Sequence, residues 1–278
     1  MIMRDIELSI VIPTYNEREN IVPLIERIEK CLKDIPIEIL VVDDNSPDGT
    51  ADLAEELGKK YGNIRVLRRG EKLGLGSAVS QGINQSRGKV IAIMDADLQH
   101  PPELLPKMLE KIKEGYDVVI ASRYVKGGGT VGWSVWRKII SRGAVLLTRV
   151  LLPFLSSIED AVSGYFMFKR VILGKTNVTA SSYKVMLEIL SISRYRSIIE
   201  IPYIFTARSR GNSKLSLKEI VSYPFVLLNL HIAHIKSKRK DFQIIYKHEN
   251  SPINCSRSIM IDDFNQKYDA IGDKNEEK

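Results

Sequence analysis

Short apolar runs alternate with amphipathic, helix-like stretches along the first half of the chain, from residue 6 to about residue 122. The apolar runs are 8–12, 37–42, 64–67, 90–94 and 118–121. The helix-like stretches between them are 20–32, 50–61, 76–86 and 102–114. Near-continuous apolar strands separated by helices are typical of a mostly parallel sheet that helices cover on both faces. The pattern therefore predicts an α/β fold with such a sheet at its centre.

Two later segments predict helices at a membrane surface. In 133–155 the apolar residues lie nearly all round a helix, and Arg142 and Arg149, seven positions apart, share one face. Such a helix is either buried in the core or lies along a membrane interface, and the sequence leaves both interpretations open. The second segment, at about 216–235, contains Pro224 and is too short to cross a bilayer comfortably, so we expect a second interface helix.

The composition of the chain changes after about residue 235. We expect residues 1–235 to form one domain that includes both interface helices. From 236 to 278 the chain is polar and charged, which predicts a loosely ordered tail. Met1 is followed almost directly by the first strand pattern, so no signal peptide is expected, and no apolar stretch reaches the roughly 18 residues of a membrane-spanning helix.

Charge and cysteine content narrow the function classes. A net charge of +7 and a pI near 9.2 suit a nucleic acid, an anionic membrane or a phosphorylated small molecule as partner. No nucleic-acid-binding motif accompanies this charge, so we expect no nucleic-acid partner. Cys31 and Cys255 are the only cysteines and allow neither a disulfide framework nor a zinc site, which favours a reducing compartment.

The most informative polar residues follow the fourth apolar run. Asp95 and Asp97, separated by Ala96, point to the same side at the carboxyl end of a parallel strand, where open α/β sheets bind ligands. Two carboxylates, together with the neutral oxygen of Gln99, suit a Mg²⁺ ion that substrate phosphates also hold. The alternative is a solvated turn after a strand, and the Asp-x-Asp pattern alone does not choose between them.

Two further strand ends place polar groups at the same edge of the sheet. Asp44 ends the second apolar run, and Tyr15 and Glu17 follow the first run. A carboxylate at this edge can accept hydrogen bonds from a nucleobase or a ribose hydroxyl. Asp44 could instead cap the following helix, but the neighbouring polar strand ends favour a ligand contact.

These motifs resemble those of the family 2 glycosyltransferases, which have the GT-A fold. The resemblance rests on three stretches, 9–17, 41–50 and 94–102, and is supported by 121–124, 136–144, 163–165 and 208–215. It covers roughly residues 6–235. Within the family, the chain is most similar to the β-mannosyltransferases that move mannose from GDP-mannose to dolichyl or another polyprenyl phosphate, forming dolichyl phosphate mannose with Mg²⁺ or Mn²⁺ as cofactor.

The resemblance also implies a role for each matching residue. The nucleotide-sugar donor would contact Pro13, Tyr15, Glu17, Val42, Asp44, Asp95, Ala96, Lys184, Arg208 and Lys214. Asp95, Asp97 and Gln99 would hold the metal ion on the diphosphate. The catalytic set would be Asp97 with Arg123, Arg137 and Ser141, the last three binding the phosphate of the lipid acceptor.

The chemistry suits these residue types. A lipid phosphate is already ionised near neutral pH, so its alignment by arginines matters more than a strong general base. Asp160 could be a base, could position one, or could cap a turn. Arg137 and Arg142 could instead be solvated charges on a helix surface.

Three further questions stay open at the sequence level. The donor could be UDP-glucose or another nucleotide sugar, and the chain could be a non-catalytic subunit of such an enzyme. Some members of the family continue into transmembrane helices, whereas this chain continues into a polar tail. We therefore expect it at the cytoplasmic face of a membrane, either attached peripherally or held by a small membrane-anchoring subunit.

Overall fold

The computed structural model describes residues 5–179, 183–207, 217–236, 244–249 and 257–259. Its main strands are β1 (Leu8–Thr14), β2 (Ile37–Asp43), β3 (Ile64–Arg68), β4 (Val90–Ile93), β5 (Val118–Ser122), β7 (Phe166–Lys169), β8 (Ser197–Pro202), β10 (Ile244–His248) and β11 (Arg257–Ile259). Its α-helices are α1 (Arg18–Cys31), α2 (Thr50–Tyr61), α3 (Leu75–Gln85), α4 (Leu105–Lys113), α5 (Val135–Leu151), α6 (Val185–Ile192) and α7 (Leu217–Lys236). Within the described ranges, every strand and helix predicted between residues 6 and 122 is present, with ends shifted by a few residues.

The strands form one large, mostly parallel sheet. Its order is β11–β10–β8–β5–β7–β4–β1–β2–β3. Strand β7 runs antiparallel to both of its neighbours, and β11 runs antiparallel to β10, whereas the other pairs are parallel. A separate parallel pair is formed by β6 (Gly129–Val131) and β9 (Ile204–Thr206). The α/β class predicted from the sequence is confirmed.

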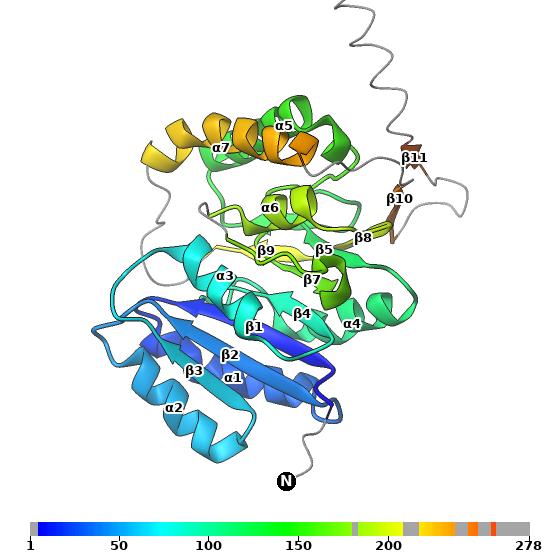
Figure 1. Cartoon of the computed structure of the whole chain (residues 1–278). Helices are drawn as coiled ribbons and strands as arrows, with labels where there is room; N and C mark the ends of the chain where they lie inside the picture. The colour runs from blue at the N-terminus through cyan, green and yellow to red at the C-terminus, as the bar shows by residue number, and fades with distance from the viewer. Residues whose placement is uncertain (1–4, 180–182, 208–216, 237–243, 250–256, 260–278) are drawn as a thin grey trace, which may run out of the picture.

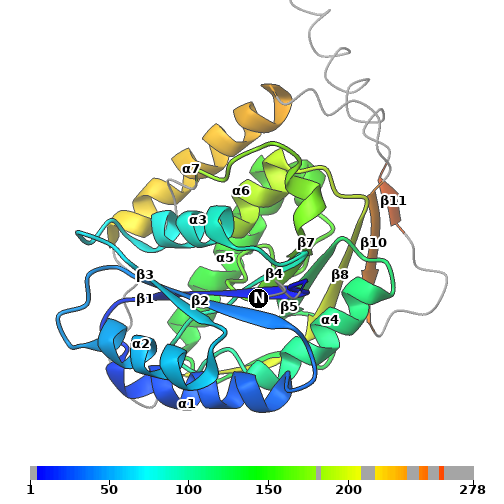
Figure 2. The ribbon, with the colours of Figure 1, turned by 60° about the horizontal axis from the view of Figure 1, so that its bottom comes forward.

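Helices cover the sheet on both faces and create two hydrophobic cores. Alternation along β1 sends Ile10 and Ile12 to one face and Val11 to the other. Helices α1, α2 and α4 pack on the first face, and α3 and α6 pack on the second face (Figure 2). Because both faces are buried, the strands are apolar along nearly their whole length. The carboxyl ends of the parallel strands lead into loops at one common edge, where polar residues such as Thr14, Asp43 and Ser122 are buried.

Helices α5 and α7 lie side by side, outside the layer that α6 forms (Figure 1). They are joined by the hydroxyls of Thr148 and Tyr223, which are 2.6 Å apart. Helix α5 buries only Val145 and Thr148 of its 17 residues. Val135, Trp136 and Ile139 are among its exposed apolar side chains, and the interface interpretation of this segment stays a prediction. Among the described residues, no helix combines the length and the hydropathy needed to cross a membrane.

The chain after residue 236 contains structure that the sequence did not predict. Strand β10 adds to the sheet beside β8 in parallel, and Tyr246 in β10 is buried. Strand β11 then pairs with β10. The sequence did not indicate these two strands, because β8 offers an open edge that only the folded sheet creates.

Candidate active site at the carboxyl ends of the strands

Three loops at the carboxyl ends of β1, β2 and β4 have the same unusual backbone feature. Each contains one residue other than glycine with a left-handed backbone: Asn16 at φ 58°, Asn45 at φ 62° and Leu98 at φ 62°. Asparagine tolerates this conformation, but for leucine it costs energy. Such strain is retained where the surrounding contacts over-determine the turn, which occurs often at ligand sites.

The turn after β4 is held by hydrogen bonds that orient Asp95, Asp97 and Gln99. Asp97 accepts a hydrogen bond from the backbone N–H of Gln99 at 3.1 Å. The Gln99 amide donates from Nε2 to the carbonyl oxygen of Thr206 at 2.8 Å, which leaves its Oε1 facing the other way. The ring of buried His100 accepts the backbone N–H of Asp95 at Nδ1, at 3.0 Å.

This donor set fits a hard divalent cation. The Asp95 side chain is 38% exposed, whereas Asp97 is buried at the base of the turn. Two carboxylates and an amide oxygen are ligands that Mg²⁺ and Mn²⁺ accept. In the described part of the chain, no three His, Cys, Asp or Glu side chains gather into a complete metal site.

The loop after β2 is organised by a buried ion pair that the sequence did not indicate. Arg69 donates from Nη1 to Oδ1 of Asp44 at 2.7 Å, and both side chains are almost completely buried. Asp44 also accepts the backbone N–H groups of Leu73 and Gly74. Asp44 therefore does not cap the following helix; it fixes the loop that leads into α3. Direct contact between Asp44 and a donor stays a prediction.

The remaining predicted donor contacts lie around this edge in different environments. The Lys72 ammonium lies 3.6 Å from the centre of the Tyr15 ring, a cation–π contact. The Glu17 carboxylate accepts a hydrogen bond from Asn20 at 2.7 Å. The Val42 side chain is 0% exposed and packs in the core, and a contact between Val42 and the donor stays a prediction. Pro13 and Ala96 are also buried.

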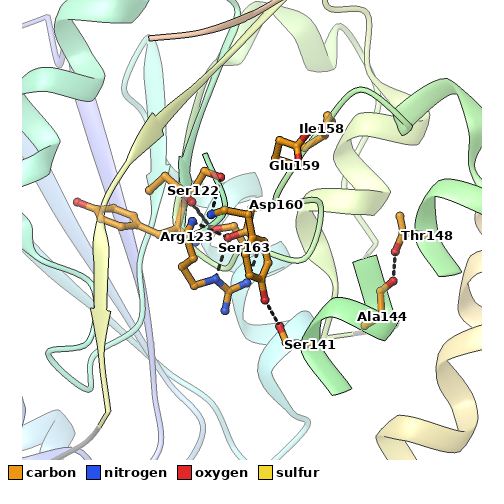
Figure 3. Close-up of polar contacts among 12 residues, drawn as sticks. Ser122, Arg123, Ser141, Ala144, Thr148, Ile158, Glu159, Asp160 and Ser163 are labelled. Carbon is orange, nitrogen blue, oxygen red and sulfur yellow. Dashed lines mark hydrogen bonds and ion pairs between the residues drawn. The ribbon is translucent and has the colours of Figure 1, made fainter. Parts of the chain in front are cut away.

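On the opposite side of the same edge, Arg123 forms an ion pair with Asp160. Its Nε and Nη2 donate to the two carboxylate oxygens, each at 2.7 Å, and its backbone N–H donates to Oδ2 at 2.9 Å (Figure 3). Burial opposes the charge on Arg123, but the attraction and hydrogen bonds of Asp160 outweigh it and hold the pKa of Arg123 above its usual value. Asp160 is 0% exposed, and its carboxylate orients Arg123. A role as a base, or in positioning one, stays a prediction.

Arg137 and Ser141, on α5, face the same side as Arg123. Ser141 Oγ accepts a hydrogen bond from the Tyr124 hydroxyl at 2.7 Å, which leaves the serine hydrogen able to donate to a ligand oxygen. The Arg137 guanidinium lies 4.4 Å from the centre of the Trp133 ring. Arg137 is therefore stacked on an aromatic ring that holds it near Arg123, whose guanidinium is 5.4 Å from the same ring.

One cavity of about 690 Å³ joins the acidic turn to the arginines. Seven of the predicted site residues line it: Asp95, Asp97, Gln99, Arg123, Arg137, Ser141 and Lys184. Side chains of α5 and α7 also line this cavity, among them Ile140, Leu147 and the ring of Tyr223. The cavity thus brings carboxylates that could hold a cation together with arginines that could hold an anion, next to apolar side chains.

Two predicted donor contacts, Arg208 and Lys214, lie outside the described residues. Sequence reasoning missed Arg69, His100 and Tyr124, which orient Asp44, the acidic turn and Ser141. His100 directly follows the Asp95–Gln99 motif, so its position was a usable signal. Nothing local to Arg69 or Tyr124 indicates their partners.

Solved structures with the same architecture define the class of fold. Mannosyl-3-phosphoglycerate synthase from Rubrobacter xylanophilus superposes with a TM-score of 0.61 at 20% identity, over 85% of this chain and 76% of that one. Glucosyl-3-phosphoglycerate synthase from Mycobacterium tuberculosis, solved with Mn²⁺, UDP-glucose and phosphoglyceric acid, has a TM-score of 0.61 at 17% identity, over 91% of this chain and 86% of that one. The fold is the GT-A fold of nucleotide-sugar-dependent enzymes.

The family follows from sequence. Residues 9–176 match the model of glycosyl transferase family 2, and the chain belongs to this family. A dolichol-phosphate mannosyltransferase from Pyrococcus furiosus is 45% identical over 78% of this chain. A polyprenol monophosphomannose synthase from Mycolicibacterium smegmatis is 38% identical over 74% of this chain and 80% of its own length. The chain spans 61% of the length of the Pyrococcus protein.

Proposed function

We propose that this protein transfers mannose from GDP-mannose to a polyprenyl phosphate such as dolichyl phosphate, with Mg²⁺ or Mn²⁺ as cofactor. The supporting observation is that one cavity is lined both by Asp95, Asp97 and Gln99 and by Arg123, Arg137 and Ser141. The first group suits the diphosphate of a donor with its cation. The second group suits the phosphate of an acceptor.

In the reaction, an oxygen of the acceptor phosphate attacks C1 of the donor mannose. The bond between C1 and the β-phosphate oxygen breaks, and GDP leaves with the electron pair. A divalent cation, when bound at the acidic turn, neutralises the charge that develops on this leaving group. Arg137 and Ser141 orient the attacking phosphate, and Arg123 adds positive potential beside it. No proton has to be removed from an ionised phosphate, so no general base is required.

The neighbouring helices support a lipid as the acceptor. Beside the cavity, α5 and α7 expose large apolar side chains that no described residue covers: Val135, Trp136, Ile139, Leu146, Val150, Val221, Phe225, Leu228 and Ile235. Exposed apolar faces with basic residues nearby are typical of helices that lie in a membrane interface. We propose that these helices rest on the cytoplasmic surface of a membrane, so that a lipid phosphate reaches Arg137 without leaving the bilayer.

The decisive experiment is transfer of labelled sugar to a polyprenyl phosphate in detergent, from GDP-mannose and separately from UDP-glucose. We expect transfer from GDP-mannose that depends on added Mn²⁺ or Mg²⁺. Transfer from UDP-glucose alone would keep the reaction type and change the donor. No transfer from either donor would contradict the proposal and would favour a non-catalytic subunit, unless addition of a membrane-anchoring partner restores activity.

A further inference from the structure

Glu200 is a buried carboxylate in the middle of the sheet, behind the acceptor side of the cavity. It lies in β8, where its register partners are Ile120 in β5 and His248 in β10, and it is 0% exposed. Its Oε2 accepts the backbone N–H of Glu159 at 2.7 Å, and its Oε1 accepts the backbone N–H of Asp160 at 2.8 Å. One side chain thus fixes two consecutive peptide groups of the loop between α5 and β7.

One of these two peptide groups belongs to Asp160, the residue that binds Arg123. The Asp160 backbone is bound by Glu200, and the Asp160 side chain binds Arg123 through three hydrogen bonds. Glu200 also forms a side-chain hydrogen bond with Ser122, the residue before Arg123. A shift of Glu200 would therefore move both the backbone and the ion-pair partner of Arg123.

Tyr246 extends this network to β10. Its buried hydroxyl donates to Oε2 of Glu200. Strand β10 is itself attached to β8 through the parallel ladder, and Lys107 on α4 pairs with Glu249 just after it at 2.8 Å. Tyr246 therefore approaches Glu200 from an anchored strand. Residues beyond 243 thus connect to the site through Tyr246, Glu200, Asp160 and Arg123.

We propose that Glu200 and Tyr246 are positioning residues for the lipid-phosphate site, which assigns part of the C-terminal segment to acceptor binding. The proposal rests on the proposed function, because it assigns Arg123 to the acceptor phosphate. A buried carboxylate is expensive compared with an apolar side chain of similar size. Here Glu200 fixes the direction of the N–H groups of Glu159 and Asp160, and an apolar side chain could not do this.

The test compares Glu200→Gln and Tyr246→Phe with Glu38→Gln. Glu38 is a matched control, because it is also a buried strand carboxylate that accepts a backbone N–H, from Arg87, but it lies at the opposite, amino end of the strands. KM for polyprenyl phosphate and KM for GDP-mannose are measured for each variant, with the melting temperature as a check on folding. Tyr246→Phe removes one oxygen and keeps the packing, so it preserves the test if Glu200→Gln does not fold.

We expect the acceptor KM to rise about tenfold in Glu200→Gln and less in Tyr246→Phe, because the glutamine NH2 group faces a backbone N–H that needs an acceptor. The donor KM should change by less than about twofold, and Glu38→Gln should leave both values unaltered. An unchanged acceptor KM in both folded variants would overturn the proposal, as would an equal rise in Glu38→Gln.

A binding readout separates this proposal from the transfer reaction itself. The chain has 2 tryptophans, Trp133 and Trp136, and Trp133 contacts both Arg123 and Arg137. In a Trp136→Phe background, quenching of Trp133 emission by polyprenyl phosphate reports binding without turnover. Weaker quenching in Glu200→Gln than in wild type supports the positioning role, whether or not wild type transfers sugar. Absence of sugar transfer by wild type would contradict only the proposed function. Equal quenching in wild type and Glu200→Gln overturns the positioning role.

Discussion

Arg69 and Asp44 form an ion pair with almost no exposed surface, although they follow two different strands, β3 and β2, and only Asp44 lies in a recognisable motif. Their side chains are 4% and 6% exposed, and Nη1 lies 2.7 Å from Oδ1. Arg69 thereby orients the Asp44 carboxylate, which accepts hydrogen bonds from the backbone N–H groups of Leu73 and Gly74. The shape of the predicted nucleoside end of the site therefore depends on a residue outside every motif.

Replacing Arg69 should impair both stability and donor binding. Arg69→Met leaves Asp44 buried without its cation, which typically costs about 3–5 kcal/mol of unfolding free energy. We expect weaker GDP binding by calorimetry, because the loop at Gly74 loses its anchor. Arg65→Met is the matched control: Arg65 pairs with buried Glu38 at 3.1 Å near the amino ends of the strands. It should lower stability without altering GDP affinity, and equal affinity losses in both variants would contradict the assignment.

Asp97→Ala should abolish sugar transfer in a protein that still folds. Asp97 accepts the Gln99 N–H and lies at the base of the acidic turn, so its loss removes a proposed metal ligand and loosens the turn. We expect transfer to fall by at least about 10²-fold and the Mn²⁺ dependence of GDP binding to disappear. Asp52→Ala, which removes an exposed carboxylate paired with Arg68, is the control and should have no effect. Normal turnover in Asp97→Ala would exclude the metal role.

Arg137→Ala should weaken use of the acceptor more than binding of the donor. Its guanidinium is held on the Trp133 ring beside Arg123, so it meets an anion at the α5 side of the cavity. We expect the KM for polyprenyl phosphate to rise by about tenfold or more, with GDP affinity unaltered. Lys138→Ala removes the next cation on the same helix, which is exposed and does not line the cavity, and serves as the control. A selective loss of nucleotide affinity in Arg137→Ala would contradict its role.

How far the sequence predicts this molecule depends on the separation of the residues concerned. Apolar runs and strand-end polar residues are local patterns, and they predicted the elements before residue 122 and the shared edge of Asp95, Asp97 and Gln99. Tyr246 and Glu200 are 46 positions apart, and Asp160 and Arg123 are 37 apart. Such pairs exist only after the sheet forms, so no local pattern indicates them.

The exposed apolar face of α5 and α7 predicts reversible attachment to membranes. Trp136 on α5 is 75% exposed, and Phe225 on α7 is 68% exposed. Burying one such side chain in a bilayer is worth about 2 kcal/mol, so Trp136→Ser with Phe225→Ser should reduce binding to anionic vesicles by about 10²-fold or more. Val171→Ser, which alters a 77% exposed side chain outside these helices, is the control for sedimentation. If the double variant sediments with vesicles as the wild type does, this face does not bind the membrane, and a protein partner would be its ligand instead.

The pH dependence of stability should reveal the environment of Glu200. Burial raises the pKa of Glu200 to about 8, from an ordinary value of 4.5, although hydrogen bonds from Glu159, Ser122 and Asp160 oppose the rise. The folded protein therefore holds a proton that the unfolded chain releases between these two values. Stability should decrease as the pH rises through that window, by at most about 1.4 kcal/mol per pH unit from this group.

Glu200→Gln removes the titrating group and should remove this part of the slope. The titratable groups Asp160 and Tyr246 face Glu200 and are retained in the variant, so their own contributions largely cancel in the comparison. Chemical denaturation of wild type, Glu200→Gln and Glu38→Gln at several pH values between 5 and 8 measures the effect, since about 1.4 kcal/mol per unit is well resolved by this method. We expect the wild type and Glu38→Gln to lose stability with rising pH and Glu200→Gln to lose less. Parallel plots of stability against pH for all three proteins would contradict this prediction. They would mean that Glu200 is ionised throughout, with its negative charge stabilised by the N–H donors and the Tyr246 hydroxyl.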